Sequence, residues 1–140
     1  MDKKILWSQE YSVNVADLDA QHKEWINICN NLIDLAGSDS FTKEEALMRV
    51  ARLGDYAHYH FSTEEKLFDE TKYPDAVAHV EAHNQFRKKA ESFIDQIRDE
   101  NIDAKETIKE IAEFTIDWLL KHILVVDKKY SEFFNQHGVK

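Results

Sequence analysis

A histidine and a glutamate four residues apart, His60 and Glu64, are the pair in this sequence with the clearest chemistry. On a helix, two residues at this spacing lie one above the other on the same face. The rest of that face is apolar at a spacing of three or four residues, and consists of Ala46, Val50, Leu53, Ala57, Leu67 and Phe68. A buried carboxylate is costly unless another group compensates its charge. With a histidine one turn away, the pair points to a bound cation.

Five of the seven histidines fall on the apolar stripes of four expected helices: His22, His60, His79, His83 and His122. Each one alone is compatible with a hydrogen-bonded core histidine, although His79 and His83, at i and i+4, can hold one metal ion together. A helical core has little reason besides a metal to collect five imidazoles, because each ring must satisfy two nitrogens away from water. His58, on the outer face of its helix, and His137, in the C-terminal tail, are not expected in the site.

Two acidic residues complete the candidate set. Glu64 shares the face of His60, whereas Glu65 points about 100° away and is expected on the surface. Asp127 follows His122 by five residues, which is about 140° on a regular helix. The two converge if the helix is distorted near residues 123–127, where the apolar pattern changes phase, or if Asp127 approaches the far side of a two-metal cluster. The alternative for Asp127 is an exposed or helix-capping role.

Five imidazoles and two carboxylates are too many donors for one zinc ion, and calcium or magnesium prefers oxygen. The seven donors divide between two octahedral ions if both carboxylates bridge them and solvent supplies a third bridge. Three histidines then complete one ion and two leave a vacancy on the other. Imidazole with carboxylate suits iron, and a vacancy on ferrous iron invites dioxygen. Manganese or a mixed cluster remains an alternative.

The elements that must position these side chains are helices, since the chain has only three Gly and one Pro. We expect an all-α, up-down-up-down four-helix bundle with an extended N-terminal arm and a short C-terminal helical segment. The expected ranges are 1–16 for the arm, 18–36, 42–70, 75–99 and 103–122 for the helices, and 124–136 for the C-terminal segment.

Length and composition indicate one domain, residues 1–140. The net charge of −9 disfavours nucleic acid as a partner. A single cysteine, Cys29, excludes an intrachain disulfide and suits a reducing compartment. The N-terminus lacks the apolar core of a signal peptide, and the longest apolar stretch, residues 118–126, is too short to span a bilayer. We therefore expect a cytoplasmic protein without membrane insertion.

The whole chain resembles the hemerythrin family in its bacterial single-domain form. The matching residues occur in order in all four helices and before the first. They are Trp7, Tyr11-Ser12-Val13, Asp19-Ala20-Gln21-His22, His60-Phe61-Ser62-Thr63-Glu64-Glu65, His79-Val80-Glu81-Ala82-His83, Phe86, Trp118-Leu119-Leu120-Lys121-His122-Ile123 and Asp127.

The resemblance implies a non-haem diiron site. One iron is held by His79, His83 and His122, the other by His22 and His60, and Glu64, Asp127 and an oxo or hydroxo group bridge the pair. The five-residue spacing from His122 to Asp127 is also a family feature. The family binds dioxygen as a hydroperoxide at the vacancy on the two-histidine iron. It lines that pocket with apolar residues, which here match Phe61, Trp118, Leu119 and Ile123.

Three functions follow as hypotheses. The first is reversible dioxygen binding for storage, delivery or scavenging, with no enzymatic activity. The second is an oxygen or redox sensor that acts through a partner protein, because 140 residues leave no room for an attached output domain. The third is a diiron peroxidase or nitric oxide reductase, which is disfavoured because no acid-base or nucleophilic apparatus accompanies the ligands. A ferritin-like site is disfavoured as well, since the chain contains no Glu-x-x-His.

Overall fold

The computed structural model describes residues 4–140, and over this range the regular elements are all helical. The first three residues of the expected arm lie outside the described part of the chain. The long helices are α1 (Ala16–Gly37), α2 (Lys43–Thr71), α3 (Ala76–Arg98) and α4 (Ala104–Lys121). Four short elements complete the fold: η1 (Gln9–Tyr11), η2 (His122–Val126), η3 (Asp127–Tyr130) and α5 (Ser131–Gln136).

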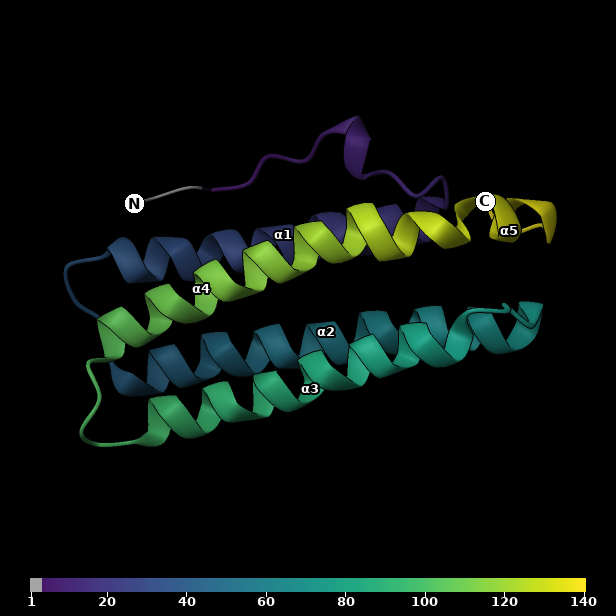
Figure 1. The fold of residues 1–140 in the computed structure, drawn as a ribbon. Coiled ribbons are helices and arrows are strands. Elements are labelled where there is room, and N and C mark those ends of the chain that lie inside the picture. Colours follow the sequence, from purple (N-terminus) through teal and green to yellow (C-terminus); the bar gives the residue numbers. More distant parts are fainter. Residues whose placement is uncertain (1–3) are drawn as a thin grey trace.

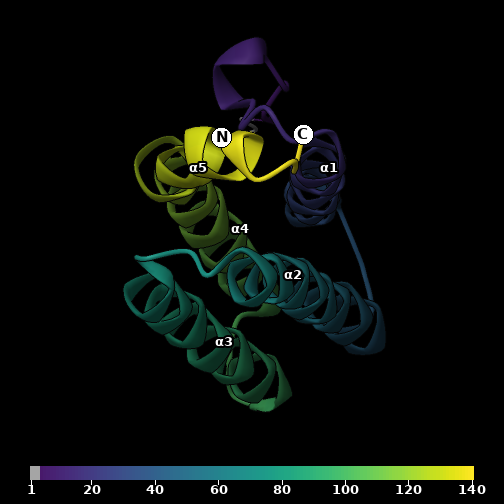
Figure 2. The same ribbon diagram turned by 90° about the vertical axis from the view of Figure 1, so that its right-hand side faces the viewer.

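The four long helices form an up-down-up-down bundle, which confirms the expected fold class (Figure 1). The turns α1–α2 and α3–α4 lie at one end of the bundle, and the turn α2–α3 lies at the other. Helix α1 runs beside α4, and α2 runs beside α3. The end-on view shows the helices around a common core, with the arm outside α1 and α4 (Figure 2). Each long helix begins and ends within two residues of its expected range.

Local side-chain chemistry accounts for several helix ends. Helix α2 begins after Thr42, whose side chain accepts a hydrogen bond from the Glu45 amide at 3.1 Å. Helix α4 begins after Asp103, which accepts from the Glu106 amide at 3.2 Å. Lys72 ends α2 in the left-handed conformation, with φ of 57°. These caps satisfy backbone groups that the helices leave unpaired.

The N-terminal arm is attached to α1 by paired hydrogen bonds. The side chain of Asn30 accepts from the Ile5 amide at 2.8 Å and donates to the Ile5 carbonyl at 2.9 Å. Nearer the start of α1, the Asp19 carboxylate accepts from the Val13 amide at 2.8 Å and from the Ser12 hydroxyl at 2.6 Å. The arm is therefore held on the bundle without pairing to a strand.

The helix geometry changes directly after α4. Element η2 is a π turn, in which the amide of Asp127 donates to the carbonyls of His122 and Ile123. A π turn takes one residue more than an α turn, because its hydrogen bonds join residues i and i+5. The distortion expected near residues 123–127 is this π turn. It brings Asp127 back toward the face that carries His122.

The core between the helices is aromatic around its middle. Trp25 is fully buried and packs at 5.4 to 6.1 Å between ring centroids against Phe61, Phe86 and Trp118.

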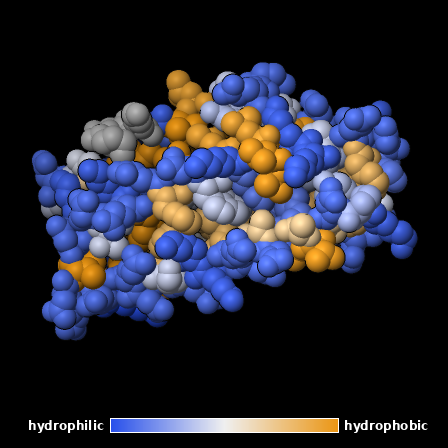
Figure 3. Space-filling view, viewed as in Figure 1, coloured by the Kyte–Doolittle hydropathy of each residue, from blue (hydrophilic) through white to orange (hydrophobic). Residues whose placement is uncertain are grey.

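The face of the molecule shown in Figure 3 is largely hydrophilic, and hydrophobic residues on it gather along the arm and the adjoining part of α4. Within residues 4–140, no helix combines the length and the apolar character that a membrane crossing requires.

Candidate metal centre

The seven candidate side chains meet in the core, and every long helix or its direct extension contributes. Helix α1 carries His22, α2 carries His60 and Glu64, and α3 carries His79 and His83, while η2 and η3, which follow α4, carry His122 and Asp127. All are buried, and none is more than 6% exposed. Because they come from four helices, only the folded bundle assembles them.

His79, His83 and His122 form one group. They lie on the same side of the Glu64 and Asp127 carboxylates. The Nε2 atoms of His79 and His122 are 3.1 Å apart. Oε1 of Glu64 lies 3.0 Å from His83 Nε2 and 3.5 Å from His79 Nε2. Oδ1 of Asp127 lies 3.0 Å from His79 Nε2 and 3.1 Å from His122 Nε2.

The other two histidines form a second group on the opposite side. Oε2 of Glu64 lies 3.2 Å from His60 Nε2 and 3.9 Å from His22 Nε2. Oδ2 of Asp127 lies 3.1 Å from His22 Nε2. Each carboxylate therefore turns one oxygen toward the three-histidine group and its second oxygen toward the two-histidine group.

Several of these buried atoms make no hydrogen bond of suitable geometry, although a nitrogen and an oxygen lie 3.0 to 3.1 Å apart in several pairs. These atoms are both ring nitrogens of His22, Nε2 of His83, Oε1 of Glu64 and both carboxylate oxygens of Asp127. Unpaired buried polar atoms are rare because each loses its hydration without compensation. Neighbouring donors around one ion, with bonds of about 2.1 Å at right angles, lie about 3.0 Å apart. The donor spacing and the missing partners both fit bound metal.

The donors divide into two sets in which the atoms lie within 4.8 Å of one another. One set is Glu64, His79, His83 and His122, and the other is His22, His60, Glu64 and Asp127. Imidazole and carboxylate ligands in this ratio suit iron better than calcium or magnesium. The cluster fits a metal site, and Glu64 belongs to both sets.

Charge within the cluster is strongly coupled. Burial opposes ionisation of Glu64, but the neighbouring imidazoles of His60, His79 and His83 hold its pKa well below 4.5. Burial and the Glu64 charge oppose ionisation of Asp127, whose pKa is nevertheless lowered by His122 and His22. Burial lowers the pKa of His79, yet Asp127 and Glu64 raise it to about 9. Two buried anions therefore attract positive charge to this place, as protons or as metal.

The outer nitrogens of two histidines have dedicated partners. Nδ1 of His60 lies 2.7 Å from the side-chain oxygen of Gln21, and Nδ1 of His83 lies 2.8 Å from Oε2 of Glu65. Both acceptors favour a proton on Nδ1 and leave Nε2 free to face the cluster. The buried hydroxyl of Tyr130 donates to Oε2 of Glu64 at 2.6 Å.

The expectation that Glu65 is a surface residue is wrong. Its side chain is 25% exposed and lies between His83 and Arg87, which donates to it at 2.8 and 3.2 Å. Glu65 does point away from the Glu64 face of α2, but α3 packs there and presents the outer nitrogen of His83. An angle on one helix could not reveal a partner on the next helix. His58 and His137 are exposed, as expected.

Aromatic rings border both histidine groups. Phe61 stacks on His83 with centroids 3.9 Å apart, and Trp118 stacks on His122 at 4.3 Å. Trp25, which our sequence reasoning left out of the site, lies edge-on to His60 at 5.7 Å. Its position three residues after His22 on the same helical stripe was the available signal. Of the four expected pocket residues, Phe61, Leu119 and Ile123 are buried and Trp118 is partly buried.

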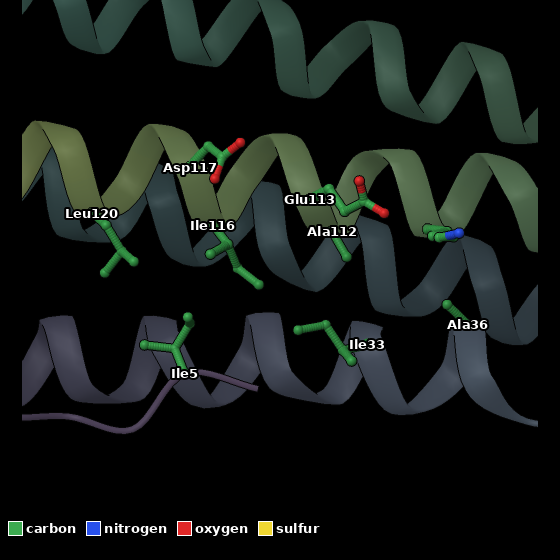
Figure 4. Close-up of a pocket in the computed structure, with 9 residues that line it drawn as sticks. Ile5, Ile33, Ala36, Ala112, Glu113, Ile116, Asp117 and Leu120 are labelled. Atoms are coloured by element: carbon green, nitrogen blue, oxygen red, sulfur yellow. The ribbon is translucent and has the colours of Figure 1, made fainter. Parts of the chain in front are cut away.

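A separate hollow of about 310 Å³ lies between the arm, α1 and α4 (Figure 4). It is lined by Ile5, Ile33, Ala36, Lys109, Ala112, Glu113, Ile116, Asp117 and Leu120. None of the seven clustered side chains and none of the four expected pocket residues lines it. This hollow is therefore distinct from the candidate metal centre.

Comparison with known families gives a match over most of the chain. Residues 13–134 match the model of the hemerythrin HHE cation binding domain. That range contains all seven side chains of the cluster, together with Gln21, Glu65 and Tyr130.

Comparison with individual proteins gives similar results. The bacteriohemerythrin of Clostridium acetobutylicum is 29% identical over 130 residues, which cover 91% of this chain and 99% of that protein. The bacteriohemerythrin of Methylococcus capsulatus is 31% identical over 122 residues, covering 87% of this chain and 89% of that protein. The crystal structure of a wild-type hemerythrin superposes with a TM-score of 0.81 at 28% identity, covering 93% of this chain and 97% of the other.

Proposed function

The chain belongs to the hemerythrin family, and on that premise we propose that its buried cluster holds two iron ions and binds dioxygen reversibly. In this proposal His79, His83 and His122 hold one ion, and His22 and His60 hold the other. Glu64 and Asp127 bridge the two ions together with an oxo or hydroxo group. The observation that carries the proposal is the two-sided carboxylate arrangement, in which each acid turns one oxygen to each histidine group.

A pair of ferrous ions supplies the electrons and the open coordination position that dioxygen requires. The protein's own contribution is the unequal division of its donors. The two-histidine group offers one imidazole fewer, so an ion held by His22 and His60 would have room to bind dioxygen. Both groups share the same two carboxylates, which keeps the two halves of the site at a fixed separation.

The surroundings of the cluster support binding rather than turnover. Phe61, Leu119 and Ile123 are buried, and the ring of Phe61 lies 6.1 Å from that of His60, so we propose these three residues together with Trp118 as the lining of the dioxygen pocket. An apolar lining keeps water and protons away from the site and so favours release of intact dioxygen. The relatives that the chain matches carry hemerythrin names. We therefore propose storage, delivery or scavenging of dioxygen as the role.

Dioxygen uptake by two matched variants tests this assignment. His60→Gln removes a proposed ligand, whereas His137→Gln changes an exposed histidine in the C-terminal tail whose ring hydrogen-bonds to the Phe133 carbonyl, outside the cluster. We expect reduced, iron-loaded His137→Gln to take up one dioxygen per chain and release it under argon, as is expected of the natural protein. His60→Gln is expected to bind less iron and to lose this uptake. Equal uptake by both variants would contradict the assignment of His60.

A further inference from the structure

The carboxylate of Glu65 joins a buried histidine of the cluster to a cation near the surface. Oε2 of Glu65 lies 2.8 Å from His83 Nδ1 and accepts from Arg87 Nη1 at 2.8 Å. Oε1 accepts from Arg87 Nη2 at 3.2 Å, which makes the ion pair two-pronged. The side chains of Glu65 and Arg87 are 25% and 21% exposed, so water screens this pair only in part.

Further contacts fix the orientation of Arg87. Its Nη1 donates to the side-chain oxygen of Asn84 at 3.0 Å, and its Nε donates to Nδ1 of His58 at 3.1 Å. The guanidinium lies over the ring of Phe61 at 5.2 Å. Since Phe61 also stacks on His83, one ring contacts both the imidazole and the cation that Glu65 connects.

We propose that Glu65 and Arg87 together position His83 and set its strength as a metal donor. Their effects on the metal affinity of His83 are opposite. This inference rests on the proposed metal-binding function of the cluster. Glu65 increases the electron donation of His83, and Arg87 limits that increase by neutralising Glu65. Both are positioning residues, because they act on a metal only through His83.

The physical reason is the charge that reaches the imidazole through its outer nitrogen. A carboxylate that accepts from Nδ1 makes the ring a stronger base at Nε2. A guanidinium paired with the same carboxylate neutralises part of its negative charge and so reduces the gain in basicity at Nε2. Direct Coulomb interaction with a bound cation has the same signs, since Glu65 attracts it and Arg87 repels it. The two-histidine group differs, because the outer nitrogen of His60 meets the neutral amide of Gln21.

Opposite signs separate this proposal from a purely structural role. Glu65→Gln keeps a hydrogen-bond acceptor for His83 but removes the negative charge, so metal affinity falls. Arg87→Gln keeps most of the side-chain length but removes the positive charge, so metal affinity rises. If the pair merely held His83 in place, either substitution would loosen the imidazole and both would weaken binding.

The test is titration of the metal-free protein with Co²⁺ alone, followed by absorbance. We expect Glu65→Gln to bind Co²⁺ about 10-fold more weakly than the natural chain, in the range known for outer partners of metal ligands. Arg87→Gln is expected to bind several-fold more tightly, and Arg87→Lys, which restores the charge, to return toward the natural affinity. In iron-loaded protein, Glu65→Gln should raise the reduction potential and Arg87→Gln should lower it.

A second ion pair provides matched controls. Arg52 donates to Glu24 at 2.9 Å between α2 and α1, and neither residue has a hydrogen bond to a clustered histidine. Glu24→Gln and Arg52→Gln make the same charge changes and are expected to leave Co²⁺ affinity unchanged. Circular dichroism before titration establishes that each variant is folded.

The possible outcomes are distinct. Opposite shifts for Glu65→Gln and Arg87→Gln support the proposal, whereas shifts in the same direction, or none, overturn it. The Co²⁺ measurement does not depend on dioxygen. Failure of dioxygen uptake by the natural protein would therefore remove the proposed function while leaving the test of Glu65 and Arg87 intact.

Discussion

Glu64 and Glu65 are neighbours in the chain, yet they contact opposite nitrogens of the same imidazole. Glu64 lies 3.0 Å from Nε2 of His83, and Glu65 lies 2.8 Å from its Nδ1. The helical angle between the two glutamates correctly separates them onto different faces of α2. The role of Glu65 depends on where α3 packs, which the pattern along α2 does not contain. Sequence periodicity therefore finds residues that face the centre of the bundle but misses partners that reach around a neighbouring helix.

The metal-free protein should lose stability as pH rises from 6 to 9. Burial lowers the pKa of His79, but Asp127 and Glu64 raise it from 6.5 to about 9. A pKa raised on folding contributes stability that is complete below 6.5 and disappears as pH rises through 9. We expect a decrease of about 1–3 kcal/mol in the free energy of unfolding, measured with urea. His79→Gln should flatten this dependence, and a natural protein that is equally stable at both pH values would contradict it.

Removal of the Tyr130 hydroxyl should destabilise the metal-free protein. That hydroxyl donates to Glu64 at 2.6 Å in a fully buried position, and a hydrogen bond to a charged group contributes about 1.5–3 kcal/mol. Tyr130→Phe should therefore lower the free energy of urea unfolding by about that amount. The matched control is Tyr59→Phe, since Tyr59 is 56% exposed and its hydroxyl has no comparable partner to lose. Similar small effects in both variants would show that the Glu64 contact adds no stability.

At the scale of elements, the four long helices follow from amphipathic stripes and end signals in the sequence. The π turn at η2 does not, because no residue type specifies an i to i+5 hydrogen bond. The change of phase after His122 indicated a distortion, and the fold supplies its form. Packing of the stripe formed by Asp127, Tyr130 and Phe134 against the bundle selects the turn that keeps all three buried.

A change at the N-terminal end of helix α2 should alter the stability of the protein without altering its metal content. The Thr42 hydroxyl caps the helix by accepting from the Glu45 amide at 3.1 Å, and His60 lies 18 residues further along. Thr42→Ala should cost about 1 kcal/mol in urea unfolding, and Thr42→Ser should restore it. Metal content measured by elemental analysis is expected to stay unchanged in both. A loss of metal in Thr42→Ala would mean that fraying at this end extends to the cluster.

At the scale of the whole molecule, the cluster joins the two helix pairs of the bundle. His22 comes from the α1–α4 pair, whereas His60, His79 and His83 come from the α2–α3 pair. The sequence indicated this convergence because donors recur on all four stripes, and the resemblance to a known family gave their pairing. It could not give the outer partners Gln21 and Tyr130, whose contacts depend on the packed positions of separate helices.

Metal removal should therefore weaken the entire bundle. A ligand that binds only the folded state adds about 2.7 kcal/mol of stability at a free concentration 100 times its Kd. We expect a strong chelator to lower the melting temperature of the iron-loaded protein, as measured by circular dichroism. Added Fe²⁺ should restore it. The His137→Gln variant, which changes an exposed residue away from the cluster, should respond in the same way. A melting temperature that does not change with metal content would show that the cluster does not couple the helices through an ion.

The most direct test of the proposed function is one cycle of oxygenation on the natural protein with its iron content measured. We expect two irons per chain after anaerobic reconstitution with Fe²⁺. We also expect a visible absorption band that appears with dioxygen, disappears under argon and returns with dioxygen. Fewer than one metal ion per chain would contradict the diiron site. Two irons with rapid, irreversible oxidation would contradict reversible binding and favour a sensor or an enzyme.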